Sequence, residues 1–203
     1  MTGETRIERR ASLSPFFSRM WPLPLIAVLA LANSSAPLNY RLDASNSNVT
    51  AKVSFLGLGS KTARFPKMSG AVTIVPNQPE RAKIDVTFDA QALTASDKST
   101  TTRLRGEKFF WVSKYPKVRF VGSSLKMTSP TKGTVSGKLT ARGLTRDETL
   151  TVAFDNDPTK LRGKAVSFTG KMRIDRRQYG MKSFQLVVGN KVNVQLRARM
   201  VPR

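Results

Sequence analysis

Ser-Lys pairs, Tyr and paired carboxylates are the side chains left for catalytic chemistry in this sequence, because histidine and cysteine are absent from all 203 residues. The absence of histidine removes the commonest general base and metal ligand, and the absence of cysteine removes thiol nucleophiles and disulfides. Two acidic pairs flank one predicted strand, Asp147-Glu148 on one side and Asp155 with Asp157 on the other. We interpret both pairs as ordinary polar residues of hairpin turns. A hydrolytic dyad is therefore disfavoured, and no enzyme activity, metal site or cofactor is expected.

An aromatic run is the second group of residues with an unusual type and spacing. Phe109, Phe110 and Trp111 are consecutive within the segment GEKFFWVSKYPKVRF, residues 106–120. We expect one or two turns of helix between residues 97 and 111, and at helical pitch neighbouring side chains point about 100° apart. The three rings then differ in role: Phe110 points inward, Phe109 packs against the rim of the domain, and Trp111 is half-exposed at the mouth of an interior slot.

The elements that must position these residues are predicted by a hydrophobic period of two. The segment KVNVQLRARM alternates strictly, and AVSFTGKMRID and KIDVTFDAQA do the same over residues 165–175 and 83–92. Alternation of this kind is typical of half-buried antiparallel strands. Further short alternating runs contain Val49 to Phe55, Val118 to Phe120, Val135 to Leu139 and Leu150 to Phe154.

The number and order of these segments predict the fold class. About eight strands separated by short turn sequences suffice to close an all-β, antiparallel, lipocalin-like barrel, with a short helical segment near residues 97–111. A β-sandwich is the alternative. Long strands near 84–92 and 164–175 joined by short links favour the barrel, and closure removes exposed strand edges.

The inward faces of the predicted strands are almost free of charge. Several inward residues are small, and they leave space that either larger neighbours or a ligand must fill: Ala90, Ala92, Gly137, Gly170 and Ala198. An ordinary packed core explains such a pattern without a ligand. An apolar slot explains it equally well, because each buried methylene of a long-chain ligand contributes about 0.8 kcal/mol without directional contacts.

The chain is strongly basic, with 35 Lys and Arg against 13 Asp and Glu and a net charge of +22. Residues 1–32 resemble a signal peptide: four arginines precede the apolar WPLPLIAVLALA, which ends in the small-x-small motif Ala30-Leu31-Ala32. Removing these residues leaves 31 basic and 11 acidic residues, a net charge of +20. We therefore expect a periplasmic protein cleaved near Ala32, with residues 33–39 as a short lead before a domain at 40–203. The charge favours contact with anionic surfaces.

Four segments resemble motifs of the YceI-like family. They are YRLDASNSNVTAKVSF, RLRGEKFFWVSKYPKVRFVGSSL, VSGKLTARGLTRDETLTV and MRIDRRQYGM, in this order along residues 40–200. The resemblance implies a secreted lipocalin-like barrel with an apolar tunnel for a polyisoprenoid chain, such as a quinone tail or polyprenyl phosphate. It also implies that Phe109 and Phe110 belong to a helical segment beside the tunnel, with the Tyr115-Pro116 turn leading back into the barrel.

The sequence departs from this family where members commonly carry polar residues. Asn46-Ser47 replaces a His-Ser pair, Phe55 or Leu56 replaces a second histidine, and Thr101 or Thr102 replaces an acidic residue. The resemblance therefore transfers no headgroup contacts to these positions. The candidate ligand-binding residues are the apolar ones: Phe55, Phe88, Phe109, Phe110, Trp111, Phe120, Leu139, Phe154, Phe168, Met172 and Ile174.

Two functions remain after the enzyme is disfavoured. The preferred one is a non-catalytic periplasmic carrier of a polyisoprenoid or quinone-like ligand, with transient contact with an anionic membrane surface. The alternative is a basic envelope-binding module for anionic lipid or polysaccharide, whose barrel is packed and ligand-free. Nucleic-acid binding is disfavoured by export and by the lack of interleaved aromatic and basic residues on one face. A homodimer is left open.

Overall fold

The computed structural model describes residues 36–57, 59–160 and 163–203. The expected signal peptide at residues 1–32 lies outside these residues. The described chain forms eleven strands, one α-helix and four short 3-10 helices. The strands are β1 (Leu38–Leu42), β2 (Asn48–Phe55), β3 (Gly59–Arg64), β4 (Met68–Ile74), β5 (Lys83–Asp89), β6 (Thr94–Ala95), β7 (Lys117–Ser129), β8 (Lys132–Ala141), β9 (Leu144–Phe154), β10 (Val166–Asp175) and β11 (Val188–Pro202). The helices are α1 (Lys98–Arg105), η1 (Ala44–Asn46), η2 (Pro79–Arg81), η3 (Ala90–Ala92) and η4 (Arg176–Tyr179).

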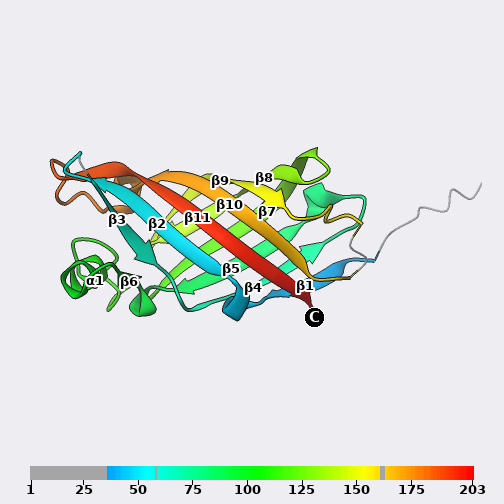
Figure 1. Cartoon of the computed structure of the whole chain (residues 1–203), viewed down its shortest axis with the longest axis horizontal. Coiled ribbons are helices and arrows are strands. Elements are labelled where there is room, and N and C mark those ends of the chain that lie inside the picture. The colour runs from blue at the N-terminus through cyan, green and yellow to red at the C-terminus, as the bar shows by residue number, and fades with distance from the viewer. Residues whose placement is uncertain (1–35, 58, 161–162) are drawn as a thin grey trace, which may run out of the picture. The chain divides into compact units, whose positions relative to one another are not determined.

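The strands form one antiparallel sheet that closes on itself (Figure 1). Strand β1 pairs with both β4 and β11, which completes the ring β1-β4-β5-β7-β8-β9-β10-β11. Strands β2, β3 and β6 continue the sheet beyond β11 and extend the barrel wall at one end. The predicted antiparallel barrel of about eight strands with one short helix is confirmed.

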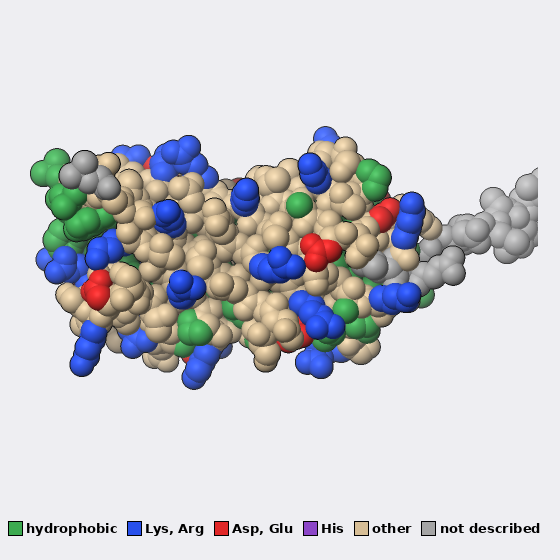
Figure 2. All heavy atoms as spheres, in the orientation of Figure 1, with side chains coloured by type: hydrophobic (Ala, Val, Ile, Leu, Met, Phe, Trp, Pro, Cys, Tyr) green, Lys and Arg blue, Asp and Glu red, His purple; other side chains and the backbone are tan. Residues whose placement is uncertain are grey.

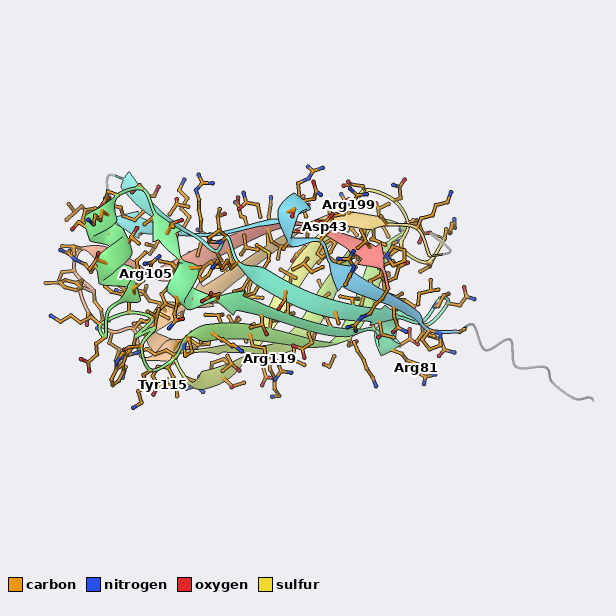
Figure 3. The ribbon with its side chains drawn as sticks, turned by 90° about the horizontal axis from the view of Figure 1, so that it is seen from below. Asp43, Arg81, Arg105, Tyr115, Arg119 and Arg199 are labelled. Atoms are coloured by element: carbon orange, nitrogen blue, oxygen red, sulfur yellow. The ribbon has the colours of Figure 1, made fainter. Side chains whose placement is uncertain are left out.

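The eleven strand segments make eight barrel strands, because three of the barrel strands are each interrupted and appear as two segments. Strands β1 and β2 pair with the same long strand β11, through Leu42 opposite Met200 and Asn48 opposite Arg197. Between them Asp43 accepts a hydrogen bond from the Asn46 amide and caps η1, so the chain leaves the sheet for one turn. Asp43 stays attached through its own amide, which donates to the Arg199 carbonyl at 2.9 Å (Figure 3).

The strand expected over residues 83–92 ends earlier, at Asp89. The Asp89 carboxylate accepts a hydrogen bond from the Gln91 amide, which turns the chain into η3. Ala90 and Ala92 therefore belong to a 3-10 turn, and the alternating pattern overextended the strand by three residues. At the other boundary, β1 begins at Leu38, two residues before the expected start of the domain.

Helix α1 covers one end of the barrel, between β6 and β7. Asp97 caps its first turn by accepting from the Thr100 amide at 2.7 Å, and Gly106 ends it. Arg105, labelled in Figure 3, donates two hydrogen bonds to the Leu93 carbonyl and so ties the last turn to the segment before the helix. The following segment, with Phe109 and Phe110, then lies against the barrel interior.

The space beside two of the small inward residues is occupied by neighbouring atoms. A Cβ on Gly137 would lie 2.5 Å from the Val121 carbonyl oxygen and 2.8 Å from the Phe120 ring, and a Cβ on Gly170 would lie 2.9 Å from Leu196 and 3.1 Å from Leu150. The backbone of β7 therefore leaves no room for a side chain at Gly137, and leucine side chains occupy the space beside Gly170. Ala198 differs, because it faces an open cavity.

Candidate functional site

An apolar cavity of about 820 Å³ occupies the interior of the barrel. Its walls come from inward-facing residues of ten strands, all except β6, together with α1, the segment after it and the loop between β10 and β11. Among the described residues that line it, the polar ones are Lys61, Asp97, Ser99, Thr100, Arg103 and Arg176, and the others are aliphatic, aromatic or Met. Cavities of 300–1,000 Å³ with mostly apolar walls and few polar groups are typical of small-molecule sites.

The cavity is long, as strand β11 shows. Val188 and then alternate residues from Val192 to Met200 line it. Twelve residues at about 3.3 Å each, on a strand tilted by about 40°, cover roughly 30 Å along the barrel axis. An extended chain covers about 1.2 Å per bond, so an isoprene unit with four chain bonds needs about 5 Å and the cavity has room for about six units.

The two ends of the cavity differ in polarity. The end nearest β1 is lined by apolar residues such as Leu42, Ile74 and Met200. The other end, which α1 covers, contains all six polar lining residues. A ligand with an apolar chain and a polar headgroup would therefore be accommodated with its headgroup towards α1.

Most of the polar groups at the α1 end already have partners. Asp97 accepts from Thr100 and from the Lys61 ammonium at 3.2 Å. The Thr100 backbone amide, and after it the Thr100 hydroxyl and Lys61, hold the pKa of the Asp97 carboxyl well below its usual range. Arg103 lies over the Phe184 ring, 5.6 Å from its centroid. The mouth of the cavity thus combines an ion pair with an arginine held against an aromatic ring.

Arg176 is buried beside the cavity and is committed to the backbone. Its guanidinium donates to the carbonyls of Met181, Ser183, Val188 and Gly189, all in the loop between β10 and β11 or the start of β11. With only 3% of its surface exposed, it has little capacity left for a ligand. Its role in the structure is to hold the loop that forms one side of the mouth.

Ten of the eleven sequence-predicted site residues line the cavity. They are Phe55, Phe88, Phe109, Phe110, Phe120, Leu139, Phe154, Phe168, Met172 and Ile174. Their contact with a ligand remains a prediction. Trp111 lies outside the lining and is half-buried, with its ring edge-on to Tyr115 at 5.7 Å.

The position of Trp111 follows from the end of α1. The helical spacing assumed for residues 109–111 does not apply, because α1 ends at Arg105 and Trp111 has a left-handed φ of 50°. The Phe109 and Phe110 side chains both point inward: Phe109 is buried, and Phe110 packs edge-on against Phe65 at 5.7 Å. Trp111 turns the other way, where Lys114 lies over its ring at 4.6 Å.

Sequence reasoning missed several groups of lining residues, including those of β3, β4, α1 and the loop between β10 and β11. Phe65, Met68, Val72 and Ile74 come from β4 and the residues just before it. Met68, Val72 and Ile74 fit a period of two that is visible in the sequence, so this group was predictable. Phe184 lies in the loop between β10 and β11, and no periodic pattern marks it as part of the wall.

The described part of the chain offers no metal site, because it contains no group of three or more His, Cys, Asp or Glu side chains suited to holding an ion. Within the same residues, no helix has the length and apolar character needed to span a membrane.

Known proteins resemble this chain in both sequence and fold. The YceI-like domain family matches residues 40–200. A UPF0312 protein of Pseudomonas putida strain GB-1 is 26% identical over 165 residues, covering 79% of this chain and 85% of the relative. A UPF0312 protein of Enterobacter sp. strain 638 is 23% identical over 161 residues, covering 77% of this chain and 83% of the relative.

Solved structures share the barrel. The crystal structure of BcnA from Burkholderia cenocepacia has a TM-score of 0.70 at 22% identity, covering 78% of this chain and 98% of that chain. A polyisoprenoid binding domain from Saccharophagus degradans has a TM-score of 0.63 at 14% identity, covering 82% and 99%. The likeness to these structures concerns the fold alone. The match of the family to residues 40–200 spans nearly the whole described barrel, and the chain therefore belongs to the YceI-like family.

Proposed function

We propose that this protein is a non-catalytic carrier that holds a polyisoprenoid, or a similar long-chain amphiphile such as a quinone, inside its barrel. The observation that carries the proposal is the cavity of about 820 Å³ with almost entirely apolar walls. Its estimated length of about 30 Å suits a chain of about six isoprene units. The Saccharophagus degradans domain, which has the same fold, is a polyisoprenoid binding domain and supports this ligand class.

The walls of the cavity suit a branched or unsaturated chain better than they suit a polar ligand held at one fixed site. Aromatic side chains recur along the cavity, with Phe154 and Phe168 at 5.5 Å in one wall and Phe65 and Phe88 at 6.0 Å in another. Such walls provide wide apolar contact but no row of hydrogen-bond donors. Binding would therefore depend on the apolar area removed from water, which increases with each isoprene unit.

The proposed location is the periplasm, with cleavage near Ala32. The signal-like sequence at residues 1–32 supports it. A compartment between two membranes is also where a carrier for a water-insoluble chain would be useful.

The alternative function, a basic envelope-binding module, requires a barrel filled by its own side chains. The net charge of +22 favours contact with anionic surfaces. However, a cavity of about 820 Å³ is far larger than the few small voids of a packed core. The interior therefore favours the carrier, and the charge is compatible with both functions.

Lipid extraction tests the carrier directly. The whole chain is expressed with export, purified without detergent and extracted with organic solvent, and the extract is analysed by mass spectrometry. We expect a prenyl lipid in near-stoichiometric amount. A protein that carries no lipid after purification, and that takes up none from added polyprenyl phosphate or ubiquinone, would contradict the proposal and favour the basic module.

A matched pair of variants separates the cavity from the surface. Ala51 lines the cavity, and its neighbour Lys52 is exposed on the outer face of β2. Ala51→Trp should reduce the bound lipid because the indole obstructs the cavity about midway along its length, beside Val194, and Lys52→Trp should retain it. Thermal unfolding of both variants checks that the loss of lipid does not come from loss of the fold.

A further inference from the structure

Three large apolar side chains are exposed together at the α1 end of the barrel. Leu186 is fully exposed at 101%, Leu56 is exposed at 56% and Phe184 at 39%. Leu56 follows β2, and the other two lie in the loop between β10 and β11. A hydrogen bond of 2.7 Å from the Leu56 amide to the Val187 carbonyl joins the two loops. The three side chains therefore form one patch, and Figure 2 shows hydrophobic side chains gathered at this end.

The patch is held in place by the structure beneath it. Leu56 and Phe184 have left-handed φ angles of 54° and 59°, an uncommon backbone conformation for side chains other than Gly and Asn. Phe184 stacks on Phe109, and Arg176 binds the Met181, Ser183 and Val188 carbonyls of the same loop. These contacts hold the backbone of the loop and the Phe184 ring in place, and the loop carries Leu186 at the surface.

Basic side chains surround the patch. Arg103 and Lys108 lie over the Phe184 ring at 5.6 and 5.4 Å, and Lys182 is exposed two residues before Phe184. Within the described part of the chain, none of these three cations belongs to an ion pair. Glu107 is the exposed acid beside Lys108. We call the six residues Leu56, Phe184, Leu186, Arg103, Lys108 and Lys182 the mouth surface.

The mouth surface is continuous with the cavity, because Leu56, Phe184 and Arg103 belong to both. An exposed apolar tip with cations beside it matches the boundary between headgroups and acyl chains of an anionic bilayer. A second copy of this chain is a poorer occupant, since two proteins of net charge +22 would bring like charges together.

We propose that the mouth surface docks on an anionic lipid bilayer and places the open end of the cavity against the membrane. This inference rests on the proposed carrier function, because docking gives the isoprenoid chain a path between bilayer and barrel without crossing water. Leu186 and Phe184 enter the interface, and Lys108 and Lys182 contact phosphate groups beside them.

Vesicle sedimentation with matched charge reversals tests the proposal. The probes are vesicles of phosphatidylcholine with about one third phosphatidylglycerol, and vesicles of phosphatidylcholine alone. The mouth variant is Lys108→Glu with Lys182→Glu, and the control is Lys126→Glu with Lys171→Glu, which makes the same charge change at exposed positions of β7 and β10. All variants are produced with export, as for the lipid extraction, so the segment before the barrel is the same in each and its contribution cancels in the comparison.

We expect the wild type to bind the anionic vesicles and the mouth variant to bind at least about tenfold more weakly, as expected for charges at a bilayer surface. The control should stay within about threefold of the wild type. Equal weakening by both double variants would overturn the proposal, because binding would then depend on total charge alone. Absence of wild-type binding would also overturn it, and would leave the mouth surface to a protein partner.

A site-specific label reports the insertion itself. The chain contains no cysteine, so Leu186→Cys and Val121→Cys can each carry one polarity-sensitive NBD fluorophore. Val121 is the matched control, a partly exposed apolar residue on the outer side of β7. Anionic vesicles should shift the emission to the blue at 186 and leave it unchanged at 121. No shift at 186, or an equal shift at both positions, counts against docking through the mouth.

Loading from detergent solution distinguishes failure of this inference from failure of the carrier. Lys108, Lys182 and Leu186 lie outside the cavity lining, so the mouth variant should reach the same final occupancy with ubiquinone supplied in detergent. Normal loading with no wild-type vesicle binding would refute docking and keep the carrier. Vesicle binding through the mouth without any loading would refute the carrier and keep a membrane-docking surface.

Discussion

The rings of Phe109 and Phe184 are stacked nearly parallel, with centroids 6.0 Å apart and planes 5° apart. Phe109 comes from the segment after α1, and Phe184 from the loop between β10 and β11, so the pair joins two otherwise separate sides of the cavity mouth. Arg176 lies against the Phe109 ring from the barrel side, 6.0 Å from its centroid. The contact therefore holds the two sides of the mouth together at the end through which a chain would enter.

Phe184→Ala should remove this contact between the two sides of the mouth. Loss of an aromatic pair costs about 1 kcal/mol, so we expect a small decrease in stability. We also expect about fivefold faster release of a preloaded fluorescent prenyl alcohol, since about 1 kcal/mol corresponds to that factor. Stopped-flow release into excess unlabelled lipid measures the rate. Leu186→Ala, in the same loop but outside the cavity lining, should leave the rate unchanged, and equal acceleration by both variants would show that the stack is not the barrier.

Arg176→Ala should destabilise the protein whether or not a ligand is present. Four backbone carbonyls lose a charged donor in a buried site, and we expect the free energy of unfolding to fall by about 3–5 kcal/mol. Urea unfolding with and without added ubiquinone measures it. Arg176→Lys should recover only part of the loss, because one ammonium has three donors and lacks the planar fork of the guanidinium.

Arg173→Ala is the control for the Arg176 prediction. Arg173 lies three residues earlier on β10 and is exposed, so its removal should change stability by less than about 0.5 kcal/mol. If Arg176→Ala were as stable as the wild type and lost only ligand binding, Arg176 would be a headgroup contact rather than the anchor of the loop.

The barrel was largely predictable because its strands are half-buried. Alternation at Val192, Val194 and Leu196 fixes which face points inward, and the structure puts these residues in the cavity wall. The interruptions of the strands were not predictable from alternation. The break after β1 depends on Asp43 capping η1, and such a local hydrogen bond leaves the hydrophobic period on either side unchanged.

The candidate site was predicted to the extent that it belongs to strands. The sequence does not show whether a small inward residue leaves a cavity beside it. The space beside Gly137 is occupied by the Val121 carbonyl and the Phe120 ring, whereas Ala198 faces the cavity. Only the three-dimensional register decides this. Trp111 was misplaced because a left-handed residue after a helix end reverses the direction of a side chain, and residue type alone does not indicate that conformation.

Asp175→Asn should reduce the dependence of stability on acidic pH. Asp175 is 7% exposed and pairs with Arg177 at 2.6 Å and Lys191 at 3.3 Å. Hydrogen bonds from Arg177, chiefly its side chain, hold the pKa of this carboxyl well below its usual value. The unfolded state therefore binds the proton more tightly than the folded state. The ionised Asp175 contributes its full stabilisation at pH values above the unfolded pKa of about 3.9, and this stabilisation is lost as the pH falls towards the folded pKa.

Urea midpoints measured between pH 7 and pH 2 check the Asp175 prediction. The stability difference between the wild type and Asp175→Asn should be largest near neutral pH and should shrink below about pH 4. Asp155→Asn is the control, because Asp155 is exposed and its ion pair with Arg197 is long at 3.8 Å, so it should contribute little. If the difference in stability between the wild type and Asp175→Asn stayed constant down to about pH 2, a role for the charge of Asp175 would be contradicted.

Ala198→Phe should shorten the chain that the barrel accepts. Ala198 lines the cavity near its β1 end, between Leu196 and Met200 on β11. A phenyl ring there would block the slot about two residues short of Met200, roughly 5 Å or about one isoprene unit. Loading from a mixture of prenyl alcohols of different length, followed by mass spectrometry, should show the bound distribution shifted shorter by about one unit.

Arg199→Phe places the same ring one residue further on, on the exposed outer face of β11, and should leave the distribution unchanged. Extra bulk in a filled core costs about 1–3 kcal/mol, so the melting temperature of Ala198→Phe also shows whether the space is free. Should that variant fail to fold, Ala198→Leu should give a smaller shift in the same direction. A folded Ala198→Phe that loads the same chain lengths as the wild type would mean that the ligand does not extend past Leu196 towards β1, and that this end of the cavity has another use.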